Sequence, residues 1–140
     1  MRQLTTSTTY NHTIVILPTN AFYSRPCSFH TFYENHESND LQILSIKSCA
    51  YHHKEENFKV IMWMRSNNPL LNDTNFRTQF ATYKNITIET VPDSEITLES
   101  ISDHIIYNHG GCFFEPNFIF MRSMQPLFWT YGTHVGVFQV

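Results

Sequence analysis

Apolar residues along this chain gather in short runs that polar and amphipathic stretches separate. Runs rich in aromatic and β-branched residues have the length and composition of strands. They are 29–33, 58–64, 86–91 and 112–114. The run at 58–64 is almost continuously apolar, as a strand covered on both faces must be. A shorter apolar run at 13–17 precedes them, and a further one at 118–121 is also expected to be a core strand.

Helical spacing fills the intervals between these strands. The polar residues Ser38, Asn39 and Asp40 predict the start of a helix. Its apolar face consists of Ile43, Ile46 and Ala50. It ends in a His-His-Lys sequence at 52–54, which suits the negative end of the helix dipole and which we expect to lie in solvent. An Asn-Pro start signal predicts another helix at 70–83.

A third helix is predicted directly before the strand at 112–114. Its apolar stripe consists of Leu98, Ile101 and Ile105. These spacings of three and four residues place one apolar face along the helix. Asp93 or Ser94 is expected to cap its start, and Gly110 and Gly111 to end it, because glycine readily takes the left-handed conformation of a helix end.

This alternation of strands and helices predicts an α/β fold with a mostly parallel sheet flanked by helices. In such a fold the residues that follow the strands meet at one edge of the sheet, where ligands bind. The tripeptides Tyr33-Glu34-Asn35, Arg65-Ser66-Asn67 and Glu115-Pro116-Asn117 have this position. The last of them places two side-chain oxygen groups on either side of a proline, an arrangement that can hold a cation or a ligand.

Composition narrows the function further. The chain has 140 residues, a net charge of −3 and 15% charged residues, which predicts one domain and argues against a nucleic-acid surface. No run of about 18 apolar residues is present, so we expect no membrane-spanning segment. The cysteines, Cys27, Cys49 and Cys112, have neither a zinc pattern nor a disulfide framework, although one bridge with one thiol stays open. Motifs of serine hydrolases, phosphate-binding loops and zinc proteases are absent.

The segment Gly110 to Met124, which reads GGCFFEPNFIFMRSM, resembles the sugar-binding region with the DxD motif in the glycosyltransferase family of α-1,4-galactosyltransferases and α-1,4-N-acetylglucosaminyltransferases. Residues 32–38 resemble the end of the first strand of that family. Residues 46–64 resemble the helix that follows it and the second strand, and residues 85–88 resemble the third strand. The resemblance extends over 29–140, which leaves 1–28 as an amino-terminal extension. It implies the amino-terminal half of a GT-A type, Rossmann-like domain that binds a nucleotide sugar.

By this resemblance the protein would transfer a hexose or N-acetylhexosamine from a UDP-sugar to a glycan or glycolipid acceptor in the Golgi lumen, using Mn²⁺. Glu115 and Asn117 take the positions of the two aspartates and would bind the metal. The implied donor-binding residues are Tyr33, Glu34, Glu99, Gly110, Gly111, Phe113, Glu115 and Asn117. Metal chemistry suits this reaction because a cation neutralises the charge that grows on the departing diphosphate.

Departures from the family pattern leave a second hypothesis open. Asn117 is a neutral ligand where the family has a carboxylate, which weakens the binding of a hard divalent cation. Ser102 stands where the family has an arginine. No signal peptide or membrane anchor is visible in the chain. The alternative function is therefore a non-catalytic relative, or a truncated one, that serves as a binding module.

Overall fold

The computed structural model describes residues 13–16, 28–56, 58–91, 97–125 and 136–139. Its strands are β1 (Thr13–Ile16), β2 (Ser28–Phe32), β3 (Lys59–Arg65), β4 (Ile86–Val91), β5 (Cys112–Phe114) and β6 (Gly136–Gln139). Its α-helices are α2 (Asp40–His53), α3 (Thr74–Thr78) and α4 (Ile101–His109). Short 3-10 helices occupy Lys54–Glu56, Pro69–Asn72 and Leu98–Ser100.

The sheet has the strand order β4-β3-β2-β5-β1-β6. Strands β4, β3, β2 and β5 are all parallel to one another, and helices connect them, so the expected Rossmann-like α/β fold is confirmed. Strand β1 pairs antiparallel with both β5 and β6. It lies within the segment 1–28 that the sequence assigned to an extension, and it joins the sheet beyond the parallel strands.

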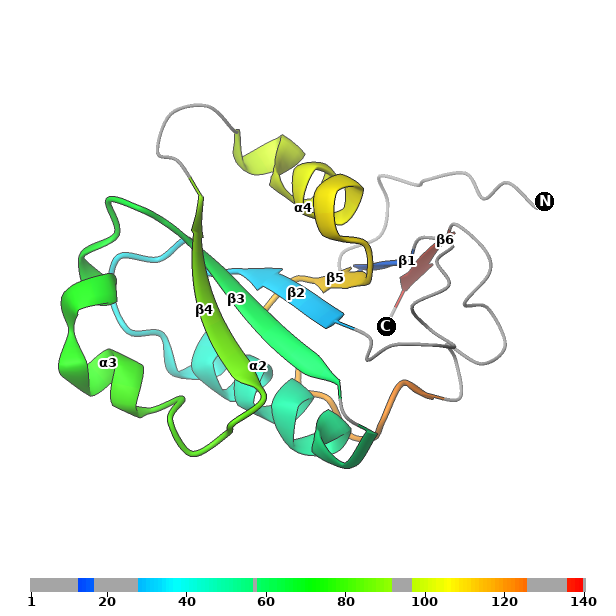
Figure 1. The fold of residues 1–140 in the computed structure, drawn as a ribbon, viewed down its shortest axis with the longest axis horizontal. Coiled ribbons are helices and arrows are strands. Elements are labelled where there is room, and N and C mark those ends of the chain that lie inside the picture. The colour runs from blue at the N-terminus through cyan, green and yellow to red at the C-terminus, as the bar shows by residue number, and fades with distance from the viewer. Residues whose placement is uncertain (1–12, 17–27, 57, 92–96, 126–135, 140) are drawn as a thin grey trace.

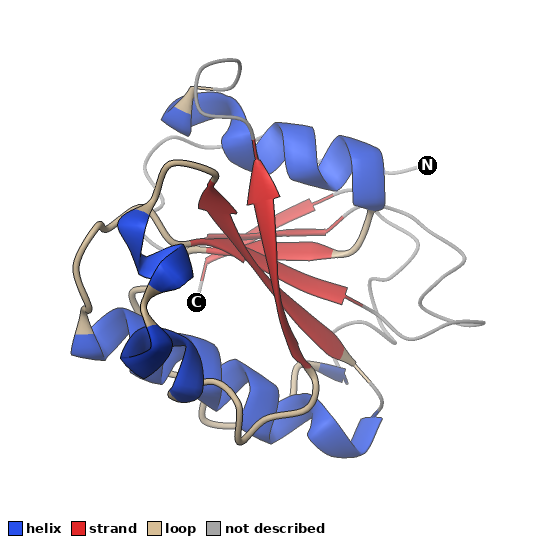
Figure 2. Cartoon of the chain, turned by 60° about the vertical axis from the view of Figure 1, so that its left-hand side comes forward, coloured by secondary structure: helices blue, strands red, loops and turns tan. Residues whose placement is uncertain are grey.

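Helices cover both faces of the sheet (Figures 1 and 2). Helix α4 lies on one face, and α2 and α3 lie on the other. Each face has its own apolar core. The α2 and α3 side includes Phe29, Ile46, Met62, Phe76 and Phe114, and the α4 side includes Phe32, Trp63, Ile101, Ile105 and Phe113. Alternate residues of a strand point to opposite faces, so the same strands supply both cores.

Helix α2 starts where the sequence predicts. The side chain of Asn39 accepts a hydrogen bond from the backbone N–H of Gln42 at 3.0 Å, which satisfies one of the helix's first donors. The prediction that the helix ends in solvent at 52–54 is wrong for His53, which is fully buried. Its Nδ1 lies 2.6 Å from the carbonyl oxygen of Cys49, and its Nε2 accepts from the backbone N–H of Met124 at 2.9 Å. The histidine is buried because both of its ring nitrogens have partners inside the fold.

Three sequence predictions about other elements need correction. The prediction of a single helix at 70–83 is wrong, because the segment forms the 3-10 helix Pro69–Asn72 and the separate helix α3. Asp73 lies between them and caps α3 by accepting a hydrogen bond from the backbone N–H of Phe76 at 3.1 Å. The strand at 118–121 is also wrong. There the backbone N–H of Phe120 donates to Ser48 Oγ on α2 at 2.9 Å, so this segment bonds to a helix rather than to the sheet.

Leu98 is the third correction. It is 53% exposed, whereas Ile101 and Ile105 of the same predicted stripe are buried. The reason is that Leu98 lies in a 3-10 turn ahead of α4, where the helical spacing of the stripe no longer holds. The predicted caps at Asp93 and Ser94 lie outside the described residues.

The double glycine connects α4 to β5 against the start of β2. Gly110 and Gly111 both have positive φ, 68° and 90°. A Cβ on Gly111 would overlap the backbone oxygen of Ser28 and lie 3.3 Å from His30 Nε2. Only glycine therefore allows β5 to lie this close to β2 at the turn.

Candidate functional site

The strand order creates a change of direction between β2 and β5. These two strands are parallel neighbours, yet the chain leaves β2 toward α2 on one face and reaches β5 from α4 on the other. In open α/β sheets such a point opens a crevice at the carboxyl ends of the two strands, and ligands bind there. The segments that follow β2 and β5 begin at Tyr33 and Glu115.

A hollow of about 380 Å³ lies at this position. Its walls come from the ends of β2 and β5, the first turn of α2, the start of α4 and the 3-10 helix before it. The lining residues are Phe32, Glu34, Gln42, Leu98, Glu99, Ile101, Ser102, Phe113, Glu115, Pro116 and Asn117. Residues from four separate parts of the sequence thus meet at one site.

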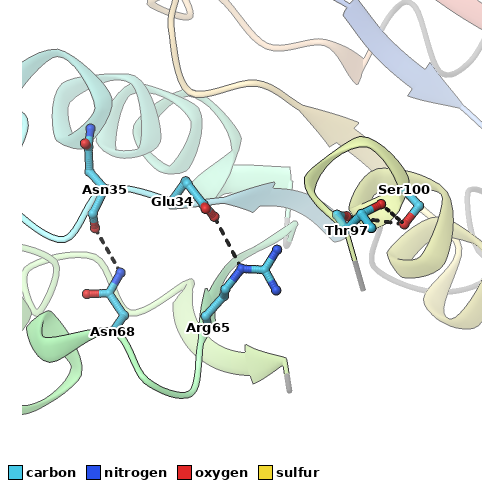
Figure 3. Close-up of polar contacts among 6 residues, drawn as sticks. All are labelled: Glu34, Asn35, Arg65, Asn68, Thr97 and Ser100. Carbon is cyan, nitrogen blue, oxygen red and sulfur yellow. Dashed lines mark hydrogen bonds and ion pairs between the residues drawn. The ribbon is translucent and has the colours of Figure 1, made fainter. Parts of the chain in front are cut away.

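Acidic side chains dominate the polar part of the lining. Glu34, Glu99 and Glu115 each contribute a carboxylate, and no lysine, arginine or histidine is among the described lining residues. Arg65 lies next to the hollow, at the end of β3. Its Nε is 3.6 Å from Glu34 Oε2 (Figure 3), and its guanidinium carbon is 5.5 Å from the centre of the Phe32 ring. The site therefore favours a cation or hydroxyl donors over a bare anion.

The turn after β5 holds its two polar side chains together. The backbone N–H of Asn117 donates to the carbonyl oxygen of Glu115 at 2.9 Å, which closes a tight turn around Pro116. The amide Nδ2 of Asn117 also lies 3.4 Å from Glu115 Oε2. Glu115 and Asn117 thus extend into the same hollow from adjacent positions.

The loop after β2 is fixed by Tyr33. Its hydroxyl donates to the carbonyl oxygen of Glu37 at 2.9 Å and accepts from the backbone N–H of Asn39 at 2.8 Å. Burial raises the pKa of this phenol, and the N–H of Asn39 opposes that shift. Asn68 Nδ2 donates to the carbonyl oxygen of Asn35 at 2.9 Å (Figure 3), so the loops after β2 and β3 are tied together. Glu34 therefore extends from a well-anchored loop.

On the opposite wall, Glu99 belongs to the short 3-10 helix that precedes α4. Next to it the hydroxyls of Thr97 and Ser100 lie 2.9 Å apart (Figure 3), and the backbone N–H of Ser100 donates to the carbonyl oxygen of Thr97 at 3.2 Å. This turn sets the direction in which Leu98 and Glu99 extend. It places them beside Ser102 at the rim of the hollow.

The structure brings together five of the sequence-predicted residues. These are Glu34, Glu99, Phe113, Glu115 and Asn117. Tyr33 is buried behind the wall as a support of the loop. Gly110 and Gly111 lie at the amino end of β5, away from the carboxyl ends of the strands, and they do not line the hollow.

Sequence reasoning missed Phe32 and Gln42 as lining residues. Phe32 is the last residue of β2, and Gln42 lies in the first turn of the following helix. The first strand–helix turn of a Rossmann-like fold faces the crevice, so this position was the available signal. Gln42 Oε1 accepts from Asn35 Nδ2 at 3.1 Å, which orients the amide at the edge of the hollow.

The donor set permits a cation with few protein ligands. Within the described residues no group of three or more His, Cys, Asp or Glu side chains is placed to hold a metal ion. Glu115 and Asn117 offer a carboxylate and an amide oxygen. Hard divalent cations with one or two such protein ligands complete their coordination with water and with substrate phosphates. The two residues fit Mn²⁺ or Mg²⁺ on that condition.

None of the helices in the described part of the chain has the length and apolar character needed to cross a bilayer. A scan against models of protein families found no match, and searches of curated proteins and of solved structures found none either. The glycosyltransferase resemblance therefore depends on the sequence motif alone.

Proposed function

We propose that this chain is a glycosyltransferase-like, GT-A type domain that binds a UDP-sugar together with a divalent cation. The observation that carries the proposal is the hollow between β2 and β5. There the two residues in the DxD positions, Glu115 and Asn117, meet Glu34, Glu99 and Phe113, although the chain between Glu34 and Glu99 is long. A nucleotide-binding crevice at this strand order is the general rule for Rossmann-like sheets.

The charge of the hollow defines how such a ligand binds. A diphosphate carries negative charge, and the lining supplies carboxylates without a basic residue among the described positions. Coulomb repulsion therefore opposes diphosphate binding by the protein alone. A divalent cation held by Glu115 and Asn117 would reverse the sign of the local charge and act as a Lewis acid for the leaving diphosphate.

Other lining residues suit the rest of a nucleotide sugar. Phe32 and Phe113 line the hollow but are only 5% and 7% exposed, so they supply an apolar floor rather than a stacking surface. Glu34 and Glu99 extend from opposite walls and accept hydrogen bonds from sugar hydroxyls. With these roles the domain would transfer a hexose or N-acetylhexosamine to a glycan or glycolipid, in the Golgi lumen.

A non-catalytic relative is the second candidate, and Asn117 favours it. The amide contributes no charge to a metal site, so cation affinity falls relative to a pair of carboxylates. The described lining residues also include no basic side chain that could offset the charge of a diphosphate in place of the cation. This too favours a relative that does not bind a nucleotide sugar for transfer. Such a protein would keep the fold and bind a sugar or a partner without transferring anything.

Charge substitutions at the two DxD positions separate these candidates. Calorimetric titration of MnCl₂ into the full chain with excess UDP should give affinity that Glu115→Gln weakens by about tenfold or more, because a carboxylate next to the cation is lost. Asn117→Asp should strengthen it by about tenfold for the converse reason. Glu89→Gln is the matched control, because Glu89 is exposed on β4 and does not line the hollow.

A Glu115→Gln effect no larger than that of the Glu89→Gln control would contradict the metal assignment. Binding that appears only in the Asn117→Asp variant would favour the non-catalytic relative. A strong wild-type interaction that requires both UDP and Mn²⁺ would favour the transferase.

A further inference from the structure

A second polar region lies at the other end of the parallel sheet, where β3 and β4 begin. Two adjoining hollows of about 480 and 420 Å³ share Lys54, Lys84 and Asn85. Tyr51, Thr82 and Tyr83 complete one of them, and Phe58, Lys59 and Thr87 complete the other. Because the strands are parallel, this region lies at the edge opposite the acidic hollow.

Lysines concentrate here although the chain as a whole is acidic. Its basic residues comprise four lysines, at 47, 54, 59 and 84, and five arginines. All of these lysines except Lys47 line the paired hollows. They are separated in the sequence, which is why no basic cluster was visible there, and the fold brings them together.

No acidic side chain offsets these lysines within the lining. The described lining residues of both hollows include no aspartate or glutamate. Glu34 pairs with Arg65 at the opposite end of the strands and does not approach these lysines. Glu55, the sequence neighbour of Lys54, is exposed and does not line either hollow. The positive charge here is therefore available to a ligand.

The backbone beneath the lysines is held in place. Asn85 Nδ2 lies within hydrogen-bond distance of the carbonyl oxygens of Ala50 and Phe58, at 3.1 and 3.3 Å, and the carbonyl of Asn85 accepts from the N–H of Val60 at 2.8 Å. These bonds fix the segment that carries Lys84 against the end of α2. Lys54 Nζ lies 4.6 Å from the centre of the Tyr51 ring, a cation–π contact that orients it.

We propose that this region, the lysine hollows defined by Lys54, Lys59 and Lys84, binds a small ligand that carries two or more phosphate or sulfate groups. Lysine ammonium groups act as point charges toward such oxyanions, and adjoining hollows suit separate anionic groups on one ligand. Three lysines contact fewer phosphates than the roughly 6–10 that a strongly salt-dependent duplex-binding protein contacts, so a small ligand is the better match. Nothing in this inference depends on the nucleotide-sugar hollow.

The test uses tripolyphosphate and a polysulfated disaccharide as separate probes of the full chain. Each is titrated calorimetrically in the presence of EDTA, so that no cation can carry phosphate into the acidic hollow. Binding should weaken when the sodium chloride concentration rises from about 50 to 200 mM. Binding of the first probe alone assigns phosphate, and binding of the second alone assigns sulfate.

Substitutions determine whether the lysine hollows are responsible. The double variant Lys59→Glu with Lys84→Glu should lose at least about tenfold in affinity, whereas Lys47→Glu should change it less than about threefold. Circular dichroism melts of all variants confirm that each is folded. The charge-matched control is Lys47→Glu with His104→Glu and Tyr107→Glu, because the last two positions are exposed on α4, on the other face of the sheet. An equal loss in this control and in the double variant would overturn the proposal, as would no heat for either probe at about 1 mM.

Discussion

Replacing Gly111 with alanine is expected to lower the free energy of unfolding by about 3 kcal/mol or more. The added Cβ would overlap the backbone oxygen of Ser28, and the residue would have to keep a φ of 90°, which L-residues rarely adopt. Relief requires β5 to move away from the start of β2. Since a domain of this size has about 5–15 kcal/mol of stability in total, much of the chain would be unfolded on mild heating.

Gly110→Ala is the matched control for this variant. Gly110 also has positive φ, but a Cβ there meets no atom within 4 Å. Its φ of 68° and ψ of −167° suit glycine and strain other residues, so we expect a smaller loss, about 1–3 kcal/mol, from backbone strain alone. Urea unfolding followed by circular dichroism measures both values. Equal losses in the two variants would show that the approach of β5 to β2 is looser than described.

Acidification is expected to destabilise the fold through His30 by about 2–3 kcal/mol between pH 7 and pH 4.5. Its pKa is lowered from 6.5 to about 4, first by burial and second by the positive charge of His109, while the backbone of Gly110 acts in the opposite sense. His30 Nδ1 accepts from Trp63 Nε1 at 3.0 Å, so the neutral ring must carry its proton on Nε2. A second proton would meet the indole N–H.

The sign of this effect follows from linkage. Between pH 6.5 and 4 the unfolded state binds a proton at this histidine and the folded state does not, so stability falls as pH falls through that window and is complete above it. Carboxylates also titrate there, so the diagnostic quantity is the difference between wild type and His30→Gln, which should shrink by the same amount on acidification. A His30→Gln variant with the wild-type pH profile would contradict the assignment.

The sequence pattern was sufficient to predict elements that depend on local hydrogen bonds or on a long apolar run. The uninterrupted run around Met62 and the cap at Asn39 both led to the observed β3 and α2. It failed where long-range contacts decide. Apolar residues near Phe120 resemble a strand, yet their backbone bonds to Ser48 on α2, and no local signal encodes that partner. His53 has the same explanation, because its burial depends on Met124.

The candidate site was also predicted only in part. Polar residues after β2 and β5 were expected to meet, and Glu34 and Glu115 do line one hollow. Tyr33 was assigned to the ligand because it lies at the end of the first strand, in the segment that resembles the glycosyltransferase family. Successive residues at a strand end point in opposite directions, however, and the Tyr33 ring packs toward α3. The lysine hollows were not predicted at all, since their basic residues are distant in sequence.

A thermal melt of the full chain with UDP and Mn²⁺, added singly and together, tests the central claim most directly. A ligand present at about one hundred times its dissociation constant adds about 2.7 kcal/mol, which raises the melting temperature of a domain this size by several degrees. The account predicts that rise with both ligands present, little with UDP alone, and its loss in Glu115→Gln. A cooperative melt with the same midpoint in all four conditions would contradict a nucleotide-sugar site in the hollow between β2 and β5.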